Sequence, residues 1–592
     1  MTAIAANSTA ASPLNDHPSP YLAMHSDDPV HWQEWQPSVL TTAAAENKLI
    51  FLSSGYFACH WCHVMQQENY QNPEIAAYLN RHFINVKIDR ELTPDLDRYM
   101  IAFAEKAAGH AGWPQHVILT PNGKPFFAFV YQPTDQLRQT LHRVQQLWQT
   151  DPQRILQAAQ SGLTQPTPPE EAPKFTLNAQ TFYRLFHSAL QSQMDDFSGG
   201  LKGSLKFPKA PILLATLNSE PDDTLQAWLK LTLDQMQSQH LFDHIHGGFY
   251  RYTVDPEWQT PHFEKMLYTQ AQLAQVYFKA AEAFERPDYA ETAQQTLAYA
   301  EQHLWHPETS LFRGSQSALD QNGDDGGAYL WSAAELRSLL THEQYHEIHQ
   351  AWSLSASPPY ALGWHPKPTQ QHWPQIRKRL QAATDDIPTD DKSLLGWNGL
   401  MLSAYAAAMQ QNPQASQRWQ QYAQPLARTL IKWLQQTHPP TALSRDNQPI
   451  GRANLQDFAY VIQGLNDWQR VQPAPGRPDE IRLLQAQAEH RFLDGNGWHL
   501  SDAPLLPGQM GQWAFPEDAL PSPTARLERQ PSRLAKTQAQ LSAKPLDFAS
   551  YGQTLTALES ASNPPPSARL PQAPHRHTAP VTEKGKADLW DF

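Results

Sequence analysis

The sequence predicts two domains of different class in one chain, an α/β domain followed by an all-α domain. The chain has 592 residues, which is more than one hydrophobic core normally supports. Strand-like and helical patterns alternate up to residue 159, and long helical patterns recur after it. A proline-rich segment, residues 164–174, separates the two kinds of pattern and is typical of a linker.

The N-terminal pattern is that of a small sheet with helices around it. Strand patterns lie at 49–53, 83–88, 116–120 and 124–130. Helical patterns lie at 63–71, 74–82, 95–108 and 136–159. The last two strands are joined by Pro121-Asn122-Gly123, which is a hairpin signal. We assign the α/β domain to residues 19–163 and expect residues 1–18 to be a disordered leader.

The part of the chain after the linker is dominated by long helical patterns separated by loops rich in Gly, Pro and Trp. These patterns lie at 177–193, 222–239, 263–285, 287–304, 396–411, 414–437, 455–470 and 477–493. Paired helices of this kind predict stacked αα-hairpins, which form either a solenoid or a closed α/α toroid. We assign this domain to residues 175–535, where the pattern does not require a complete ring. We assign residues 536–592 to a weakly ordered tail because periodicity fades there.

The charge and hydropathy of the sequence indicate which partners and which cellular compartment to expect. The formal net charge is −13 and no strongly basic run occurs, which argues against nucleic acid or an anionic membrane as a partner. The N-terminal stretch lacks the cationic start and apolar segment of a secretory signal, and no run is apolar enough to span a bilayer. We therefore expect a cytoplasmic protein.

The chain's two cysteines lie in one motif, Cys59-His60-Trp61-Cys62, directly after a predicted buried strand. At the start of a helix, free backbone N–H groups and the helix dipole favour a thiolate, so Cys59 would attack and Cys62 would resolve the mixed disulfide. This context predicts a thioredoxin-like domain with a redox-active dithiol. His60 and Trp61 would tune or pack around it, and Pro114, just before a strand, is expected to be cis and to contact it.

Three other interpretations of the motif remain open. With His63 it matches a covalent haem attachment site, but that maturation needs export and no export signal is present. Cys59, His60, Cys62 and His63 could bind zinc, although ligands this close rarely complete a tetrahedron and no second Cys-x-x-Cys exists. The two cysteines could also be buried and inert. We predict no metal and no cofactor.

Several long motifs resemble one known family. The N-terminal ones are "SPYLAMHSDDPVHWQEW", "FLSSGYFACHWCHVM", "INVKIDRE" and "GWPQHVILTPNGKPF", and the later ones are "LKFPKAP", "GGFYRYTVDPEWQTPHFEKMLY", "GGAYLWSAAEL", "DDKSLLGWNGLML" and "NLQDFAYVIQGL". In this order they resemble the spermatogenesis-associated protein 20 family, including its bacterial YyaL-like members. The resemblance implies a thioredoxin-like domain joined to an (α/α)6 toroid, similar to six-hairpin glycosidases and N-acylglucosamine 2-epimerases. It does not specify a substrate.

The sequence departs from the family pattern at several places. Thr269 follows Tyr268 where family members usually carry Asp, and Gly203-Ser204-Leu205 replaces a glycine-rich stretch before the Lys-Phe-Pro element. A late Pro-Ser-Gly-Asn-Ser element reads Pro521-Ser522-Pro523-Thr524-Ala525 here. These changes count against an intact sugar-processing site.

A second candidate site lies in the helical domain. Glycoside hydrolysis uses a pair of carboxylates, whereas epimerisation uses acid/base groups such as His beside a carbon-bound proton. His262 and Glu264 offer both types, with Arg251, Asp255 and Trp258 just before them. Other polar or aromatic residues in the motif blocks are Asp325, Asp390, Asp391, Trp397, Asn398 and Asp457.

The same residues also have structural explanations. Asp390 and Asp457 each precede an apolar periodic run and could be helix caps. His262 and Glu264 could be a buried pair that fastens a loop, and the aromatic loops could be packing between hairpins.

Three functions follow from these features. The first is a thiol–disulfide oxidoreductase acting on a protein thiol or disulfide client. The second is a carbohydrate-active enzyme, an epimerase, isomerase or hydrolase, with the thioredoxin-like domain regulatory and a carbohydrate as ligand. The third is a non-catalytic binding protein in which the dithiol senses redox state. The intact dithiol beside altered late motifs favours the first.

Overall fold

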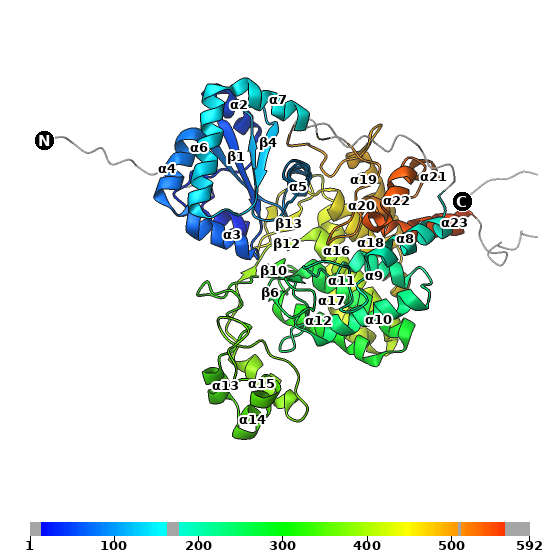
Figure 1. Ribbon diagram of the computed structural model, residues 1–592. Helices are drawn as coiled ribbons and strands as arrows, with labels where there is room; N and C mark the ends of the chain where they lie inside the picture. Colours follow the sequence, from blue (N-terminus) through cyan, green and yellow to red (C-terminus); the bar gives the residue numbers. More distant parts are fainter. Residues whose placement is uncertain (1–13, 163–176, 507–508, 510, 563–592) are drawn as a thin grey trace, which may run out of the picture.

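The computed structural model describes residues 14–162, 177–506, 509 and 511–562 (Figure 1). The predicted linker at 164–174 and most of the predicted leader lie outside these residues. Leu14, within the predicted leader, is fully buried, so its side chain belongs to the core. No helix among the described residues is long and apolar enough to cross a membrane.

The N-terminal domain is built on a four-stranded sheet in the order β2-β1-β3-β4. The strands are β1 (Leu49–Gly55), β2 (Phe83–Asp89), β3 (Gln115–Leu119) and β4 (Pro125–Phe129). β1 and β2 are parallel, and β3 is antiparallel to both β1 and β4. The helices are α1 (Pro20–Ala23), α2 (Pro37–Glu46), α3 (His60–Met65), η1 (Gln66–Tyr70), α4 (Pro73–His82), α5 (Pro94–Ala108), α6 (Thr134–Thr150) and α7 (Pro152–Gly162). This is the predicted thioredoxin-like α/β fold.

The central strand β1 explains why the sheet is covered on both faces. All seven of its residues are buried. Because successive side chains of a strand point to opposite faces, Leu49 and Phe51 join one apolar cluster and Ile50 and Leu52 join another. A strand buried on both faces reads as a continuous apolar run, which is the pattern that predicted it.

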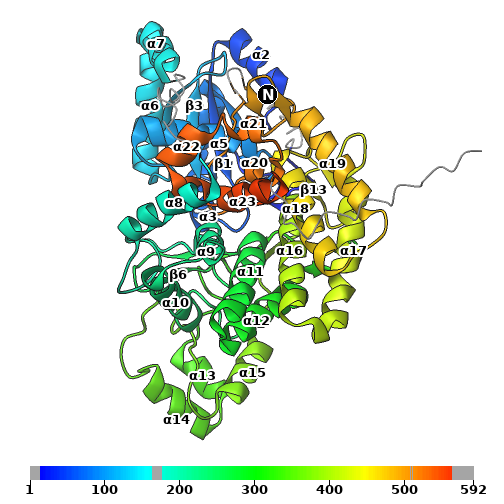
Figure 2. The same cartoon turned by 90° about the vertical axis from the view of Figure 1, so that its right-hand side faces the viewer.

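The C-terminal part is a helical toroid, as the sequence predicted. Its main helices are α8 (Ala179–Gln193), α9 (Ala210–Leu217), α10 (Asp223–Ser238), α11 (Leu267–Phe284), α12 (Pro287–His303), α16 (Leu395–Gln411), α17 (Ser416–Leu434), α18 (Leu455–Val471), α19 (Arg477–Phe492), α20 (Pro523–Leu527), α22 (Gln538–Ala543) and α23 (Tyr551–Ser562). Helices α9, α11, α16, α18 and α20 pack side by side in that order, and α10, α12, α17 and α19 lie outside them. α23 contacts both α20 and α8, so the last helix meets the first (Figure 2).

The C-terminal end differs from the expectation of a weak tail beginning at residue 536. Residues 538–562 form α22, a short 3-10 helix (Pro545–Phe548) and α23, which pack against α8. Leu541, Phe548 and Tyr551 are buried there. Sparse apolar residues suffice because they fill the remaining position of the ring; residues 563–592 lie outside the described residues.

Two further features complete the architecture. Helices α13 (Ala333–Leu339), α14 (His342–Ala351) and α15 (Trp373–Ala383) form a projection with its own apolar cluster, away from the rest (Figure 1). Short strands from the inter-helix loops lie between the toroid and the thioredoxin-like domain (Figure 1). They are β5 (Tyr252–Thr253) with β6 (Pro261–His262), β7 (Lys265–Met266) with β10 (Ser315–Gln316) and β11 (Thr389–Asp390), and β12 (Ser393–Leu394) with β13 (Ala442–Leu443) and β14 (Pro449–Ile450).

Candidate functional site

The two cysteines are joined in a disulfide at the start of α3. Cys59 is the N-cap residue, and its Sγ accepts a hydrogen bond from the backbone N–H of Cys62 at 3.1 Å. Both side chains are buried, Cys59 at 2% and Cys62 at 1% exposure. The Trp113–Pro114 peptide bond is cis, as the sequence predicted. The dithiol therefore has the local setting expected from its motif.

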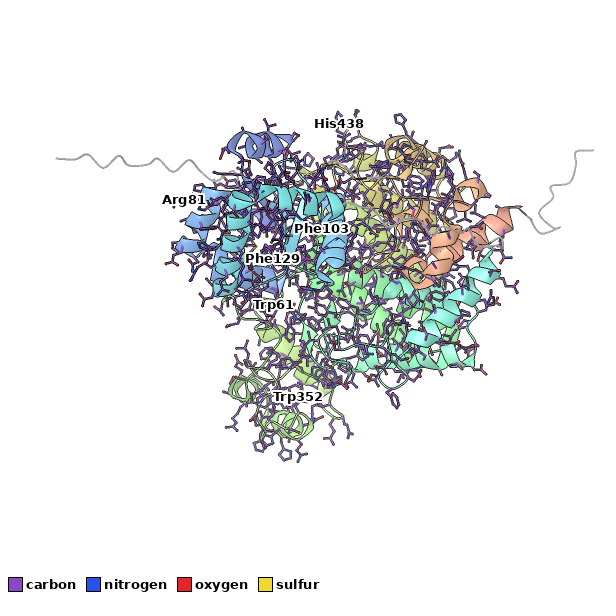
Figure 3. All side chains as sticks on the ribbon, turned by 45° about the horizontal axis from the view of Figure 1, so that its top comes forward. Trp61, Arg81, Phe103, Phe129, Trp352 and His438 are labelled. Atoms are coloured by element: carbon purple, nitrogen blue, oxygen red, sulfur yellow. A yellow bond between two sulfur atoms is a disulfide. The ribbon has the colours of Figure 1, made fainter. Side chains whose placement is uncertain are left out.

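The residues between the cysteines point in different directions. Trp61 is 42% exposed and its ring lies 5.0 Å from that of Tyr131 at the edge of the thioredoxin-like domain (Figure 3). His60 faces the helical domain, where its Nδ1 lies 3.5 Å from Asp325 Oδ1 and its ring lies 6.0 Å from that of His262. Loops of the helical domain thus form one wall of the dithiol site.

A buried polar cluster crosses from one domain to the other beside the dithiol. Tyr56, three residues before Cys59, donates its hydroxyl hydrogen to Glu264 Oε2 at 2.8 Å. Arg251 Nη1 lies 3.1 Å from the same carboxylate oxygen and also donates to the Tyr56 hydroxyl. Burial raises the pKa of Tyr56 well above its usual value, so the phenol stays protonated and donates. The cluster couples the dithiol loop to the predicted second site.

The surroundings of His262, the histidine of the second site, favour the uncharged form of its imidazole ring. Burial lowers the pKa of His262, although the charges of Glu264 and Asp325 oppose this. Its ring stacks on Tyr252 with centroids 4.6 Å apart, and its Nδ1 is buried without a hydrogen-bond partner among the described residues. Burial also raises the pKa of Asp325. Both side chains lie against His60, on the side of the dithiol motif that faces the helical domain.

A pocket opens in the helical domain beside this cluster. Its cavity volume is about 30 Å³, and it is partly open to solvent. Its polar and aromatic lining includes Phe207, Lys209, Arg251, Tyr268, Thr269 and Gln272, with Asp518 opposite Lys209 at 3.1 Å. Thr269 is the position that departs from the family pattern, and it lines this pocket.

A second group of charges joins the domains away from the pocket. Lys392, fully buried in the helical domain, lies 3.1 Å from Asp89 and 2.7 Å from Glu91 of the thioredoxin-like domain and also contacts Asp390. Burial raises the pKa of both Glu91 and Asp390, and Lys392 opposes this. This buried ion group is therefore shared by the two domains.

The structure brings some predicted second-site residues together and places others elsewhere. Arg251 and Glu264 converge on Tyr56, and His262 lies between Tyr252 and His60. Trp397 packs its ring 4.8 Å from that of Tyr268 at the pocket. Asp391 lies 3.0 Å from Arg313 in an ion pair.

The remaining predicted residues hold loops and helix ends. Asp255 accepts backbone N–H groups of its own loop, and Trp258 is fully buried and donates to Ser198 O at 2.8 Å. Asn398 accepts a hydrogen bond from the backbone N–H of Phe312 and donates one to the backbone carbonyl of the same residue. Asp457 completes a capping box with Asn454 at the start of α18. The alternative explanation as a helix cap is thus correct for Asp457.

Sequence reasoning did not include Tyr56 in the site, although it lies in the dithiol motif block. Its role depends on Arg251 and Glu264, which are about two hundred residues away, so no local sequence pattern could have predicted it. Among the described residues, no group of three or more His, Cys, Asp or Glu side chains is placed to hold a metal ion.

The fold and the site together define a thioredoxin-like dithiol domain mounted on a helical toroid. Residues 11–165 match a family model described as a protein of unknown function, DUF255, with the name Thioredox_DsbH. The thioredoxin-like assignment of the N-terminal domain is therefore supported independently of the topology.

The resemblance to the spermatogenesis-associated protein 20 family is confirmed. The chain is 28% identical over 575 residues to spermatogenesis-associated protein 20 of Homo sapiens, covering 83% of this chain and 71% of that protein. It is 27% identical over 569 residues to the uncharacterized protein B0495.5 of Caenorhabditis elegans, covering 85% and 77%. Among solved structures, it is similar to a D-mannose isomerase, with a TM-score of 0.41, 12% identity, and coverage of 65% of this chain and 85% of that one.

Proposed function

We propose that the protein is a thiol–disulfide oxidoreductase whose Cys59–Cys62 dithiol works at the junction with the helical domain. The observation that carries this proposal is the pairing of the two cysteines at the start of α3, with Cys59 Sγ accepting the N–H of Cys62. That hydrogen bond and the helix dipole favour a thiolate on Cys59 when the disulfide is reduced.

The exchange follows from the two sulfur atoms. The Cys59 thiolate attacks one sulfur of a substrate disulfide, so a mixed disulfide forms and the first substrate thiolate leaves. Cys62 loses its proton to solvent and attacks Cys59 Sγ, which forms the Cys59–Cys62 bond and releases the second substrate thiolate with its electron pair. Two electrons pass to the substrate, and a thiol reductant such as glutathione returns the protein to the dithiol.

The test is a redox titration of the full chain against glutathione, with free thiols mass-tagged at each potential. A reversible two-electron transition that disappears in Cys59→Ser and Cys62→Ser is expected. Failure to form an intramolecular disulfide at any potential would overturn the proposal, because a dithiol enzyme must cycle between both states.

A second candidate function is binding of a neutral polar ligand such as a carbohydrate in the pocket beside Arg251. The lining of the pocket supports it, because aromatic rings and a balanced pair of charges, Lys209 and Asp518, are what a neutral polar ligand would contact. A panel of mono- and disaccharides in a thermal shift assay tests it, with Gln272→Leu as the pocket variant. An increase in melting temperature that Gln272→Leu abolishes is expected, and no shift with any sugar would contradict it.

A further inference from the structure

Gly55, the last residue of β1, lies close to the side chain of Tyr21 on α1 and the side chain of Cys62 on α3. A Cβ atom at this position would lie 2.2 Å from the Tyr21 hydroxyl oxygen and 2.8 Å from Cys62 Sγ, and these are the nearest atoms to it. Glycine is thus required for both groups to come so close to the strand. The phenol oxygen and the sulfur share the space above Gly55.

The Tyr21 hydroxyl is buried without a hydrogen-bond partner among the described residues. The whole side chain is 0% exposed. A buried polar group left unpaired costs about 1–3 kcal/mol, so such a group needs an explanation. Burial raises the pKa of Tyr21 well above its usual value, so its hydroxyl keeps the proton and can only gain by donating it to an acceptor.

The helix that carries Tyr21 is anchored, so the position of the hydroxyl near Gly55 is fixed by the fold. Ser19 caps α1 and donates its hydroxyl hydrogen to Asp89 Oδ2 at 2.7 Å, which ties α1 to the end of β2. The ring of His25 contacts the Tyr21 ring edge-on at 5.1 Å, and Lys87 Nζ lies 5.3 Å from its centroid.

We propose that the Tyr21 hydroxyl is the hydrogen-bond donor for Cys62 sulfur in the reduced protein, and that it stabilises the Cys62 thiolate during the resolving step. In the disulfide, Cys62 Sγ is bonded to Cys59 and is a weak acceptor, which leaves the phenol unpaired. Reduction frees the sulfur, and a buried thiolate is a strong acceptor that needs a donor. This inference rests on the proposed oxidoreductase function.

The step it serves is the second half of the exchange. Cys62 gives its proton to solvent, and its thiolate attacks Cys59 Sγ, so that the Cys59–Cys62 bond forms, the bond from Cys59 to the substrate sulfur breaks, and that sulfur leaves with the electron pair. Tyr21 keeps its proton throughout. The titratable groups around the pair are Lys87 on β2, His25 and Asp28 after α1, Asp89 at the end of β2, Asp97 on α5, Tyr70 on η1 and His63 on α3.

The test compares wild type with Tyr21→Phe in the full chain. The reduced protein is mixed with excess oxidised glutathione, quenched with acid at intervals, and the mixed disulfide at Cys59 is measured by mass spectrometry. In Tyr21→Phe, closure of the mixed disulfide should slow about tenfold because a charge-assisted hydrogen bond is lost. The pH at which closure becomes half-maximal should rise, while formation of the mixed disulfide keeps its rate.

Tyr99→Phe is the matched control, since it also removes a buried hydroxyl without a hydrogen-bond partner in the described part of the chain, on α5. It should close at the wild-type rate. If Tyr21→Phe also closes at the wild-type rate with the wild-type pH profile, the inference is overturned. If wild type itself never closes, the oxidoreductase proposal fails instead.

A second measurement separates the hydrogen bond from a general loss of structure. Tyr21→Phe should melt at or above the wild-type temperature when oxidised, because no hydrogen bond is removed, and below it when reduced. Incorporating 3-fluorotyrosine at position 21 keeps the shape and makes the hydroxyl a stronger donor, so closure should be faster than in wild type. Equal effects in both redox states would contradict the inference.

Discussion

At the scale of single residues, the dithiol site depends on buried groups whose partners come from outside the motif. Cys59 caps its own helix by accepting the N–H of Cys62, whereas Tyr56 donates its hydroxyl hydrogen to Glu264 of the helical domain. Lys87 is fully buried and lies over three aromatic rings, with its Nζ 3.1 Å from Ser53 Oγ. These groups make stability sensitive to pH and to small changes of volume.

Lys87 predicts a pH-dependent stability. Burial lowers the pKa of Lys87 to about 7 from its usual 10.5. Between these values the unfolded chain binds one more proton than the folded one, so stability rises with pH, by about 1.4 kcal/mol per unit. Lys87→Met should remove this slope and be more stable than wild type at pH 6, measured by denaturant unfolding from pH 6 to 10. The same slope in both proteins would contradict the prediction.

Gly55 predicts a volume limit at the dithiol. In Gly55→Ala the added methyl would overlap the Tyr21 hydroxyl and Cys62 Sγ. Both groups are buried, so the variant should be less stable by about 1–3 kcal/mol and should form the disulfide less readily. Gly109→Ala, where nothing lies near the added carbon but φ is +75°, serves as a comparison for glycine loss without a clash. Melting temperature and disulfide content measure both effects.

At the scale of elements, two inner helices of the toroid begin directly after a short strand at the junction with the thioredoxin-like domain. α11 follows β7 and α16 follows β12 directly in the chain. The start of α18 is instead held by Asp457, which accepts the N–H of Asn454 and of Gly396 and the hydroxyl of Thr441. Caps of this kind determine where the loops that carry the site leave the helices.

The cap of α18 gives a prediction about the stability of the helical domain. Asp457→Ala leaves three donors without their acceptor, so the helical domain should lose about 2 kcal/mol of stability. Asp479→Ala, at an exposed first-turn position of α19, should change stability by less than about 0.5 kcal/mol. The midpoint of unfolding of the helical domain in urea measures both, and equal shifts would contradict the role of the cap.

At the scale of the whole molecule, the two domains share one interior. The largest apolar cluster includes Tyr56 and Cys62 of the thioredoxin-like domain and Met266 and Tyr268 of the helical domain. Polar contacts at other points add to it, such as Trp35 Nε1 to Leu505 O and Arg98 to Pro516 O, each at 3.0 Å. The two cysteines therefore lie in a site that neither domain completes alone.

Lys392 should control how firmly the domains are joined. Lys392→Met leaves Asp89, Glu91 and Asp390 buried without their cation. Carboxylates left this way hold protons more tightly when folded, so the folded state binds more protons and the loss of stability grows as pH rises from 5 to 8. We expect faster alkylation of the reduced cysteines and a larger radius of gyration at pH 8.

The control for this prediction is Arg470→Met, which removes an exposed ion pair with Asp467 on the outer surface. It should leave alkylation rates and size unchanged. Lys392→Met with wild-type alkylation at both pH values would mean that the other contacts between the domains hold them together without Lys392.

The sequence by itself determined the two fold classes, the dithiol and its cis-proline position, because each depends on local periodicity or on a motif a few residues long. It also located the block from Arg251 to Glu264, but not which of its residues face the dithiol. The contacts of Tyr56 with Arg251 and Glu264 and of Lys392 with Asp89 and Glu91, and the approach of Tyr21 and Cys62 to Gly55, were decided only by the tertiary structure. Each joins residues that are distant along the chain. The partner of a buried polar group depends on how the elements pack, and a local sequence pattern contains no information about that packing.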